Sequence, residues 1–174
     1  MRDEAAFVEF AHSARERLRR TAYLMCGDWD QASDHVQEGL IRVYVAWPRL
    51  QRAGREYAYA RKAVTSAFLD HRRRRSSGEV PTEPDEARAS GHDLAESVTA
   101  RTALMAALAD LPPRQRACVV LRYFEDLTVA DTAAALGCSE GTVKSQTSRA
   151  LDSLRSMFED SPLGELTAGG APTW

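Results

Sequence analysis

Residues 127–150 constrain the fold of this chain more than any other segment, because they predict two short helices joined by one sharp turn. Thr128 is a favourable N-cap, and Asp131 three residues later can close a capping box around the first turn. Gly137 stands where a helix C-cap takes a positive φ, and Ser139 can cap the next helix. Small alanines between the caps let the two helices cross closely. The segment is therefore predicted to be a helix-turn-helix.

The second helix of this motif carries the side chains of a DNA recognition helix. Glutamine can bind adenine bidentately, lysine and arginine bind guanine or phosphate, and serine and threonine bind either. A solvated face of an ordinary helical hairpin is the alternative, since short polar helix faces are common. The predicted DNA-binding residues are Ser139, Thr142, Lys144, Ser145, Gln146, Ser148 and Arg149.

Further motifs lie around this segment. Residues 111–116 are LPPRQR, residues 120–128 are VLRYFEDLT and residues 141–145 are GTVKS, and together they resemble region 4 of bacterial sigma factors. Residues 30–47, DQASDHVQEGLIRVYVAW, are similar to regions 2.1 and 2.2 of the same proteins. Two such regions in this order, with nothing else between them, resemble the extracytoplasmic-function (ECF) group of the sigma-70 family.

The helical patterns and this resemblance predict an all-α fold of two small domains. Region 2 is expected at 1–75, a flexible acidic linker at 76–93, region 4 at 94–160 and a disordered tail at 161–174. The linker is rich in Gly, Pro and acidic residues and cannot bury a core. Its 18 residues span at most about 60 Å, enough to hold two promoter elements at once. It either threads a basic polymerase channel or is a solvated spacer.

Charge is distributed unevenly along the chain. Residues 1–75 hold 15 Lys and Arg against 10 Asp and Glu, residues 76–100 hold 1 against 6, and residues 101–174 hold 7 against 9. A protein that binds DNA alone usually has a strongly basic reading domain, because phosphate neutralisation supplies most non-specific affinity. We therefore expect a larger partner to present this protein to promoter DNA, and the resemblance implies RNA polymerase core. The alternatives are a stand-alone helix-turn-helix regulator and a helical protein that only sequesters partners.

A helix predicted at 29–46, closed by Pro48, has one apolar stripe and a mixed second face. An exposed Ile and Val among polar residues is typical of a protein-binding surface. By resemblance, this face binds the clamp coiled coil of polymerase, and region 4 binds the flap. Gly39 is expected to cost the helix about 1 kcal/mol relative to Ala. The predicted polymerase-binding residues are Asp34, Gln37, Glu38, Ile41, Arg42 and Val45.

A basic loop at 49–55 is expected before a third helix at 56–75, which ends in HRRRR. The arginine run is either a solvated helix end or, by resemblance, part of the surface that captures the non-template strand of the minus-10 element. Promoter opening needs flipped bases and a basic track. The usual tryptophan is absent, so Tyr57 or Tyr59 supplies the aromatic surface. The predicted contacts are Arg49, Gln51, Arg52, Arg55, Tyr57, Tyr59, Arg61, Lys62, Arg72, Arg73, Arg74 and Arg75.

The sequence shows no pattern typical of an enzyme. It has no phosphate-cradling glycine loop, nucleophile elbow or metal cluster, so we expect neither catalysis nor a cofactor. The three cysteines are scattered and are expected to be reduced. Without a long apolar run or a signal-peptide pattern, we expect a cytoplasmic protein. The resemblance also implies an anti-sigma factor, which would clamp the two domains together and release them.

Overall fold

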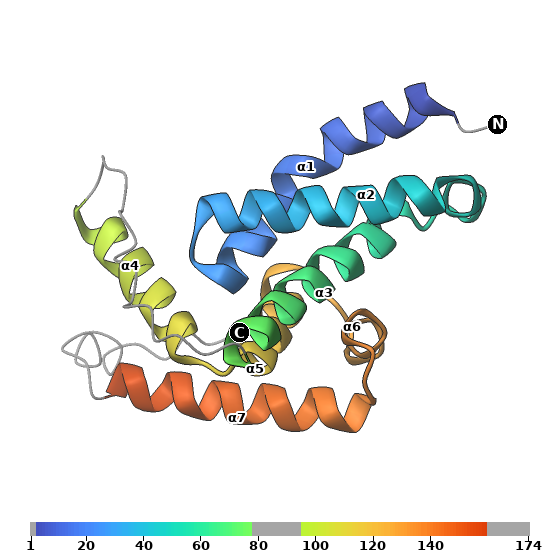
Figure 1. The fold of residues 1–174 in the computed structure, drawn as a ribbon. Coiled ribbons are helices and arrows are strands. Elements are labelled where there is room, and N and C mark those ends of the chain that lie inside the picture. The colour runs from blue at the N-terminus through green and yellow to red at the C-terminus, as the bar shows by residue number, and fades with distance from the viewer. Residues whose placement is uncertain (1–2, 78–94, 160–174) are drawn as a thin grey trace, which may run out of the picture.

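The computed structural model describes residues 3–77 and 95–159, and the side chains of 95–99 lie outside this description. The described residues form seven α-helices and one short π-helix, with turns between them, which confirms the predicted all-α fold. Figure 1 shows α3 running between α2 and the group formed by α5, α6 and α7. The molecule thus has an N-terminal unit of three helices and a C-terminal unit that packs beneath the third.

The N-terminal unit consists of α1 (Glu4–Cys26), α2 (Trp29–Ala53) and α3 (Glu56–Ser77). Asp28 caps α2, since its carboxylate accepts hydrogen bonds from two backbone amides at 2.7 and 2.8 Å. The core of this unit is apolar and partly aromatic. Trp47 is 2% exposed, and its ring centroid lies 5.3 Å from those of Phe7 and Phe10.

The predicted end of the second helix at Pro48 is wrong. The α2 helix continues through Pro48 to Ala53 and ends at Gly54, whose φ of 60° permits a left-handed cap. Proline removes one N–H donor from a helix, but Leu50 beyond it packs against the N-terminal core. This packing favours two more helical turns, so most of the predicted basic loop at 49–55 is helix.

The C-terminal unit consists of α4 (Ala95–Asp110), α5 (Pro113–Val119), the π-helix η1 (Val120–Phe124), α6 (Val129–Leu136) and α7 (Glu140–Glu159). The caps of the helix-turn-helix are confirmed. The Thr128 hydroxyl accepts from the Asp131 amide at 3.0 Å, Gly137 has a φ of 63°, and the Ser139 hydroxyl accepts from the Thr142 amide at 3.1 Å.

The π-helix changes which side chains enter the core. The apolar pattern of residues 113–124 predicts a buried Tyr123, but this residue is 57% exposed, and Phe124 is 47% exposed. A π-turn adds one residue to the helical repeat, so it rotates the following side chains relative to an α-helix. Glu125, directly after it, is buried instead.

The two units contact each other directly. Met25 and Phe68 of the N-terminal unit, both 0% exposed, share one apolar cluster with residues of α5, η1 and α6. The members from the C-terminal unit are Ala117, Val120, Leu121, Leu127 and Ala135. Of the predicted linker at 76–93, the first two residues end α3 and the rest lies outside the described residues, as does the predicted tail at 161–174.

Candidate nucleic-acid interface

The outer face of α7 presents the predicted recognition residues. Two of them, Thr142 and Gln146, are half-buried, while Val143 and Ala150 on the opposite side are fully buried. The helix is therefore packed against the rest of its unit on one side, which determines the direction of its outer face. The predicted contacts that are exposed are Ser139, Lys144, Ser145, Ser148 and Arg149.

The second basic surface follows the end of α2 and the length of α3. Arg49, Gln51 and Arg52 are exposed on the last turns of α2, and the Arg52 Nε donates to the Pro48 carbonyl at 2.8 Å. From Arg55 to the end of α3, exposed cations are interspersed with two tyrosines and two half-buried arginines. Arg55, Tyr59, Lys62, Arg73, Arg74 and Arg75 are exposed, whereas Tyr57, Arg61 and Arg72 are half-buried.

Part of this surface is covered by Glu125 of the C-terminal unit. The Glu125 side chain is 3% exposed, and its Oε2 accepts from Arg17 at 3.1 Å and from Arg61 at 3.3 Å. Its Oε1 accepts from the Thr21 hydroxyl at 2.5 Å and from the Tyr57 hydroxyl at 3.4 Å. One buried carboxylate is thus satisfied by four donors of α1 and α3, as a buried charge requires.

Tyr57 is held within this cluster by both cations. The guanidinium carbons of Arg17 and Arg61 lie 4.8 and 5.5 Å from the centroid of its ring. Burial, and then the nearby Glu125 carboxylate, raise the pKa of Tyr57 to about 12, so its hydroxyl remains a donor at neutral pH.

A second charged group joins the two units. Arg116 is 3% exposed, and its guanidinium donates to the carbonyl of Met25 at 2.7 Å and to that of Leu111 at 3.2 Å. Burial, followed by repulsion from Arg72, lowers the pKa of Arg116 to about 10. This group therefore stays charged at neutral pH and satisfies carbonyls at two helix ends.

Sequence reasoning missed these interface residues. Glu125 and Arg116 belong to the motifs at 120–128 and 111–116, but no pairing pattern marked their partners Arg17 and Thr21. A charged residue inside an otherwise apolar helical pattern was the available signal, because such a residue is buried only when it is paired.

The mixed face of α2 is exposed as predicted. Ile41 and Val45 are 59% and 64% exposed, Asp34 and Gln37 are exposed, and Glu38 and Arg42 are half-buried. Arg42 pairs with Glu38 one turn away and lies 4.0 Å from Asp70 of α3. The face therefore combines apolar side chains with ion pairs that keep the flanking charges ordered.

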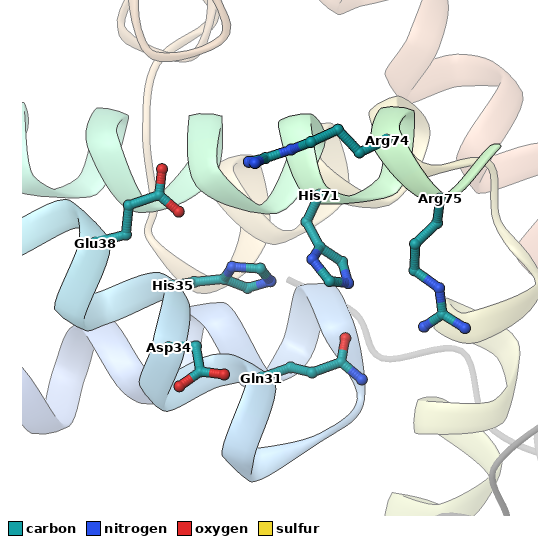
Figure 2. Close-up of a pocket in the computed structure, with 7 residues that line it drawn as sticks. All are labelled: Gln31, Asp34, His35, Glu38, His71, Arg74 and Arg75. Atoms are coloured by element: carbon teal, nitrogen blue, oxygen red, sulfur yellow. The ribbon is translucent and has the colours of Figure 1, made fainter. Parts of the chain in front are cut away.

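An open pocket of about 430 Å³ lies between α2 and α3, beside this face. Figure 2 shows the side chains of His35 and His71 extending toward each other, and their rings meet edge to face at 69° with centroids 5.4 Å apart. Burial and then His71 lower the pKa of His35, so this buried imidazole is neutral at pH 7. Within the described residues, no group of three His, Cys, Asp or Glu side chains could hold a metal ion.

The chain matches family models over both units. The sigma-70 region 2 model matches residues 10–78, and the sigma-70 region 4 model matches residues 101–154. An RNA polymerase sigma-E factor of Streptomyces avermitilis is 38% identical over 159 residues, covering 90% of this chain and 87% of the relative. The ECF RNA polymerase sigma factor SigM of Mycobacterium tuberculosis is 31% identical, covering 85% of this chain and 74% of the relative.

A solved structure has the same fold. The sigma factor RpoE of Bartonella quintana, crystallised with the anti-sigma factor NepR, aligns with a TM-score of 0.65 at 22% identity, covering 90% of this chain and 98% of that one. The two family models and the relatives together define the class of this protein. It belongs to the ECF group of the sigma-70 family of RNA polymerase sigma factors. No described helix is long and apolar enough to cross a membrane.

Proposed function

We propose that this sigma factor binds RNA polymerase core in the cytoplasm and directs initiation at promoters that carry minus-10 and minus-35 elements. It is a specificity subunit, and the polymerase performs the chemistry. The observation that carries the proposal is the capped helix-turn-helix, whose second helix is buried on one side and presents polar side chains on the other.

The minus-35 element is read as duplex by α7. The N-terminal half of this helix enters the major groove, with Lys144, Gln146 and Arg149 as its main base and phosphate contacts. Ser139, Thr142, Ser145 and Ser148 flank them with hydroxyl groups that bind bases or backbone. The Ser139 hydroxyl caps the helix N-terminus, and the remaining free amides there are proposed to bind a backbone phosphate.

The minus-10 element is captured as a single strand by the end of α2 and by α3. Arg49, Gln51, Arg52 and Arg55 surround the junction of the two helices and form the candidate base-specificity pocket. Tyr59 is exposed and offers the stacking surface, with Tyr57 beside it. The phosphate track follows α3 through Arg61, Lys62, Arg72, Arg73, Arg74 and Arg75.

The polymerase clamp binds the mixed face of α2. Exposed Ile41 and Val45 supply the apolar centre of this contact, and Asp34, Gln37, Glu38 and Arg42 supply its polar rim. The units are proposed to correspond to residues 1–75 and 94–160, joined by 76–93. An anti-sigma factor that covers both units is a further expected partner.

Run-off transcription tests this proposal. We would combine the protein with Streptomyces RNA polymerase core and a library of promoter fragments, and compare the wild type with the triple variant Lys144→Ala, Gln146→Ala, Arg149→Ala. Each lost base contact costs about 1–3 kcal/mol, so specific transcripts should fall by at least about 100-fold. The matched control is Arg155→Ala, because Arg155 is exposed on the same helix and pairs with Asp152.

The outcomes separate the possible functions. Transcripts that need the protein, disappear with the triple variant and persist with the control support a sigma factor that reads DNA through α7. Equal transcription by the triple variant would contradict this use of α7. Retention of duplex DNA without polymerase, and no transcript, would indicate a stand-alone regulator.

A further inference from the structure

We propose that Arg17, Thr21, Tyr57 and Arg61 form a phosphate site for a single DNA strand, and that Glu125 occupies this site while the two units are in contact. The inference rests on the proposed function and deepens it. It adds two α1 residues, Arg17 and Thr21, to the strand-binding surface, and it gives Glu125 the role of an internal competitor of DNA.

The donor set suits an oxyanion. Two guanidinium groups, from Arg17 and Arg61, reach one carboxylate oxygen, and two hydroxyl groups, from Thr21 and Tyr57, reach the other. Guanidinium binds carboxylate and phosphate by the same charge-assisted hydrogen bonds, and hydroxyls add neutral donors to either. A backbone phosphate could therefore replace the Glu125 carboxylate without any change in the four donors.

The donors and the acceptor belong to different units. All four donors lie on α1 and α3, whereas Glu125 follows η1 of the C-terminal unit. When the units separate, Glu125 leaves as part of its own unit and the donors stay together on the N-terminal core. The Arg17 side chain is 61% exposed even while the two units are in contact, so the site lies at the edge of the interface and Arg17 is reachable from solvent.

The site also continues the basic surface of α3. Half-buried Arg61 lies one turn after Tyr57 on one face of α3, and exposed Lys62 lies one turn after exposed Tyr59 on a neighbouring face. A strand that binds Lys62 and crosses from this face to that of Arg61 would bring a phosphate close to Arg61. Since Glu125 holds Arg61 of this track and Arg17 of α1 beside it, contact between the units lowers the affinity for the strand, and the strand favours separation of the units.

Fluorescence anisotropy with fluorescein-labelled (dT)20 and the full chain tests this competition. Glu125→Gln removes the competing charge and keeps the side-chain shape, so (dT)20 should bind about tenfold tighter than to the wild type. Its salt dependence should be steeper by about 0.7 in log–log slope, which corresponds to one more phosphate contact on a single strand. Glu9→Gln is the matched control, because it makes the same charge change at an exposed position of α1.

A second variant assigns the gain to the site. Adding Arg17→Ala to Glu125→Gln should return both the affinity and the slope to wild-type values. The inference is overturned if Glu125→Gln and Glu9→Gln bind (dT)20 with equal affinity and slope. It is also overturned if the gain persists without Arg17, because the added phosphate would then bind elsewhere.

If Glu125→Gln does not fold, amide hydrogen exchange of the wild-type protein tests whether the strand displaces Glu125. Saturating (dT)20 should speed the exchange of backbone amides at 120–127, since the strand displaces Glu125 and loosens that segment. Unchanged exchange there at saturation overturns the inference. If run-off transcription depends on α7 while these DNA-binding tests fail, the phosphate site is wrong and the sigma function stands. Loss of the α7 dependence would instead contradict the proposed function.

Discussion

The two units of this protein are stabilised in different ways. The N-terminal unit has a core drawn from its own three helices, with Leu18, Val36 and Trp47 at its centre. The C-terminal unit has a smaller core around Leu108 and Leu111, and much of its remaining apolar surface packs against α1 and α3. The N-terminal unit is therefore the scaffold, and the C-terminal unit depends on it for part of its burial.

The two proposed DNA surfaces differ in how far contact between the units covers them. The face of α7 is exposed while the units are in contact, because the C-terminal unit packs through α5, η1 and α6. The α3 surface is covered in part by the Glu125 contacts. The proposed duplex recognition is thus unaffected by contact between the units, whereas the proposed strand capture is weakened by it. Three substitutions and one change of pH test this difference between the units.

The largest effect is expected for Phe68→Ala, in the cluster that both units share. Phe68 is fully buried, so its truncation should lower the free energy of unfolding by about 3–5 kcal/mol. Phe124→Ala, at a residue 47% exposed, should change it by less than about 0.5 kcal/mol. Chemical denaturation measures both. Amide exchange in α6 and α7 should rise in Phe68→Ala, and unchanged exchange there would show that the C-terminal unit does not depend on the shared cluster.

Gly39→Ala should destabilise the N-terminal unit, although alanine favours a helix by about 1 kcal/mol. A Cβ at this position would lie 2.6 Å from the Val64 Cγ2 and 3.2 Å from the Val64 backbone nitrogen. The resulting overpacking should outweigh the helix propensity and cost a net ~1–2 kcal/mol in thermal or chemical unfolding. Gly141→Ala is the control, because only the Ser139 Oγ lies near its added Cβ, at 3.8 Å, and stability should be kept or raised. A stabilised Gly39→Ala would contradict the close packing of α2 on α3.

Thr128→Ala should have a smaller effect, confined to the C-terminal unit. It removes the hydroxyl that accepts from the Asp131 amide, so the free energy of unfolding should fall by about 1 kcal/mol. Ser156→Ala, at an exposed position of α7, should be nearly neutral. Equal stability of the two variants in urea denaturation would show that the cap is dispensable once α6 is packed.

Mild acid should have the smallest effect, through His35. Its pKa lies below the ordinary 6.5 because burial and His71 disfavour the charged ring, while Asp34 and Glu38 oppose this shift. Arg74 and Arg75 also line the pocket. The neutral ring contributes stability above pH 6.5, and this contribution is lost as the pH falls through the folded-state pKa. The stability of His35→Gln should therefore depend less on pH than that of the wild type or of His12→Gln, where the imidazole is exposed. Parallel pH profiles for the three proteins would contradict the shift.

Local chemistry made much of the fold predictable. Caps at Thr128, Gly137 and Ser139 act within one or two helical turns, so their positions in the sequence determined where the helices of the helix-turn-helix begin and end. The exposed Ile41 and Val45 were predictable for a similar reason, since helical periodicity separates one face from the other.

Errors arose where a distant contact outweighed a local preference. Pro48 ordinarily stops a helix, but packing of Leu50 on the N-terminal core continues α2 beyond it. Tyr123 follows the apolar pattern of its helix, but the π-turn of η1 leaves it exposed. The helix cost predicted for Gly39 concerns propensity alone, and the structure adds a close neighbour on another helix, Val64.

Residues close together in the chain specify most of the helices, their caps and the polar face of α7, so these features and the family were predictable from the sequence. How the two units meet was visible only in the folded molecule, since it depends on pairs such as Arg17 and Glu125, more than a hundred residues apart. A buried carboxylate has no preferred partner in sequence, because any donors that the fold brings within reach can satisfy it. The fold brought Arg17, Thr21, Tyr57 and Arg61 to Glu125, and thereby joined the proposed strand-binding surface of one unit to the other unit.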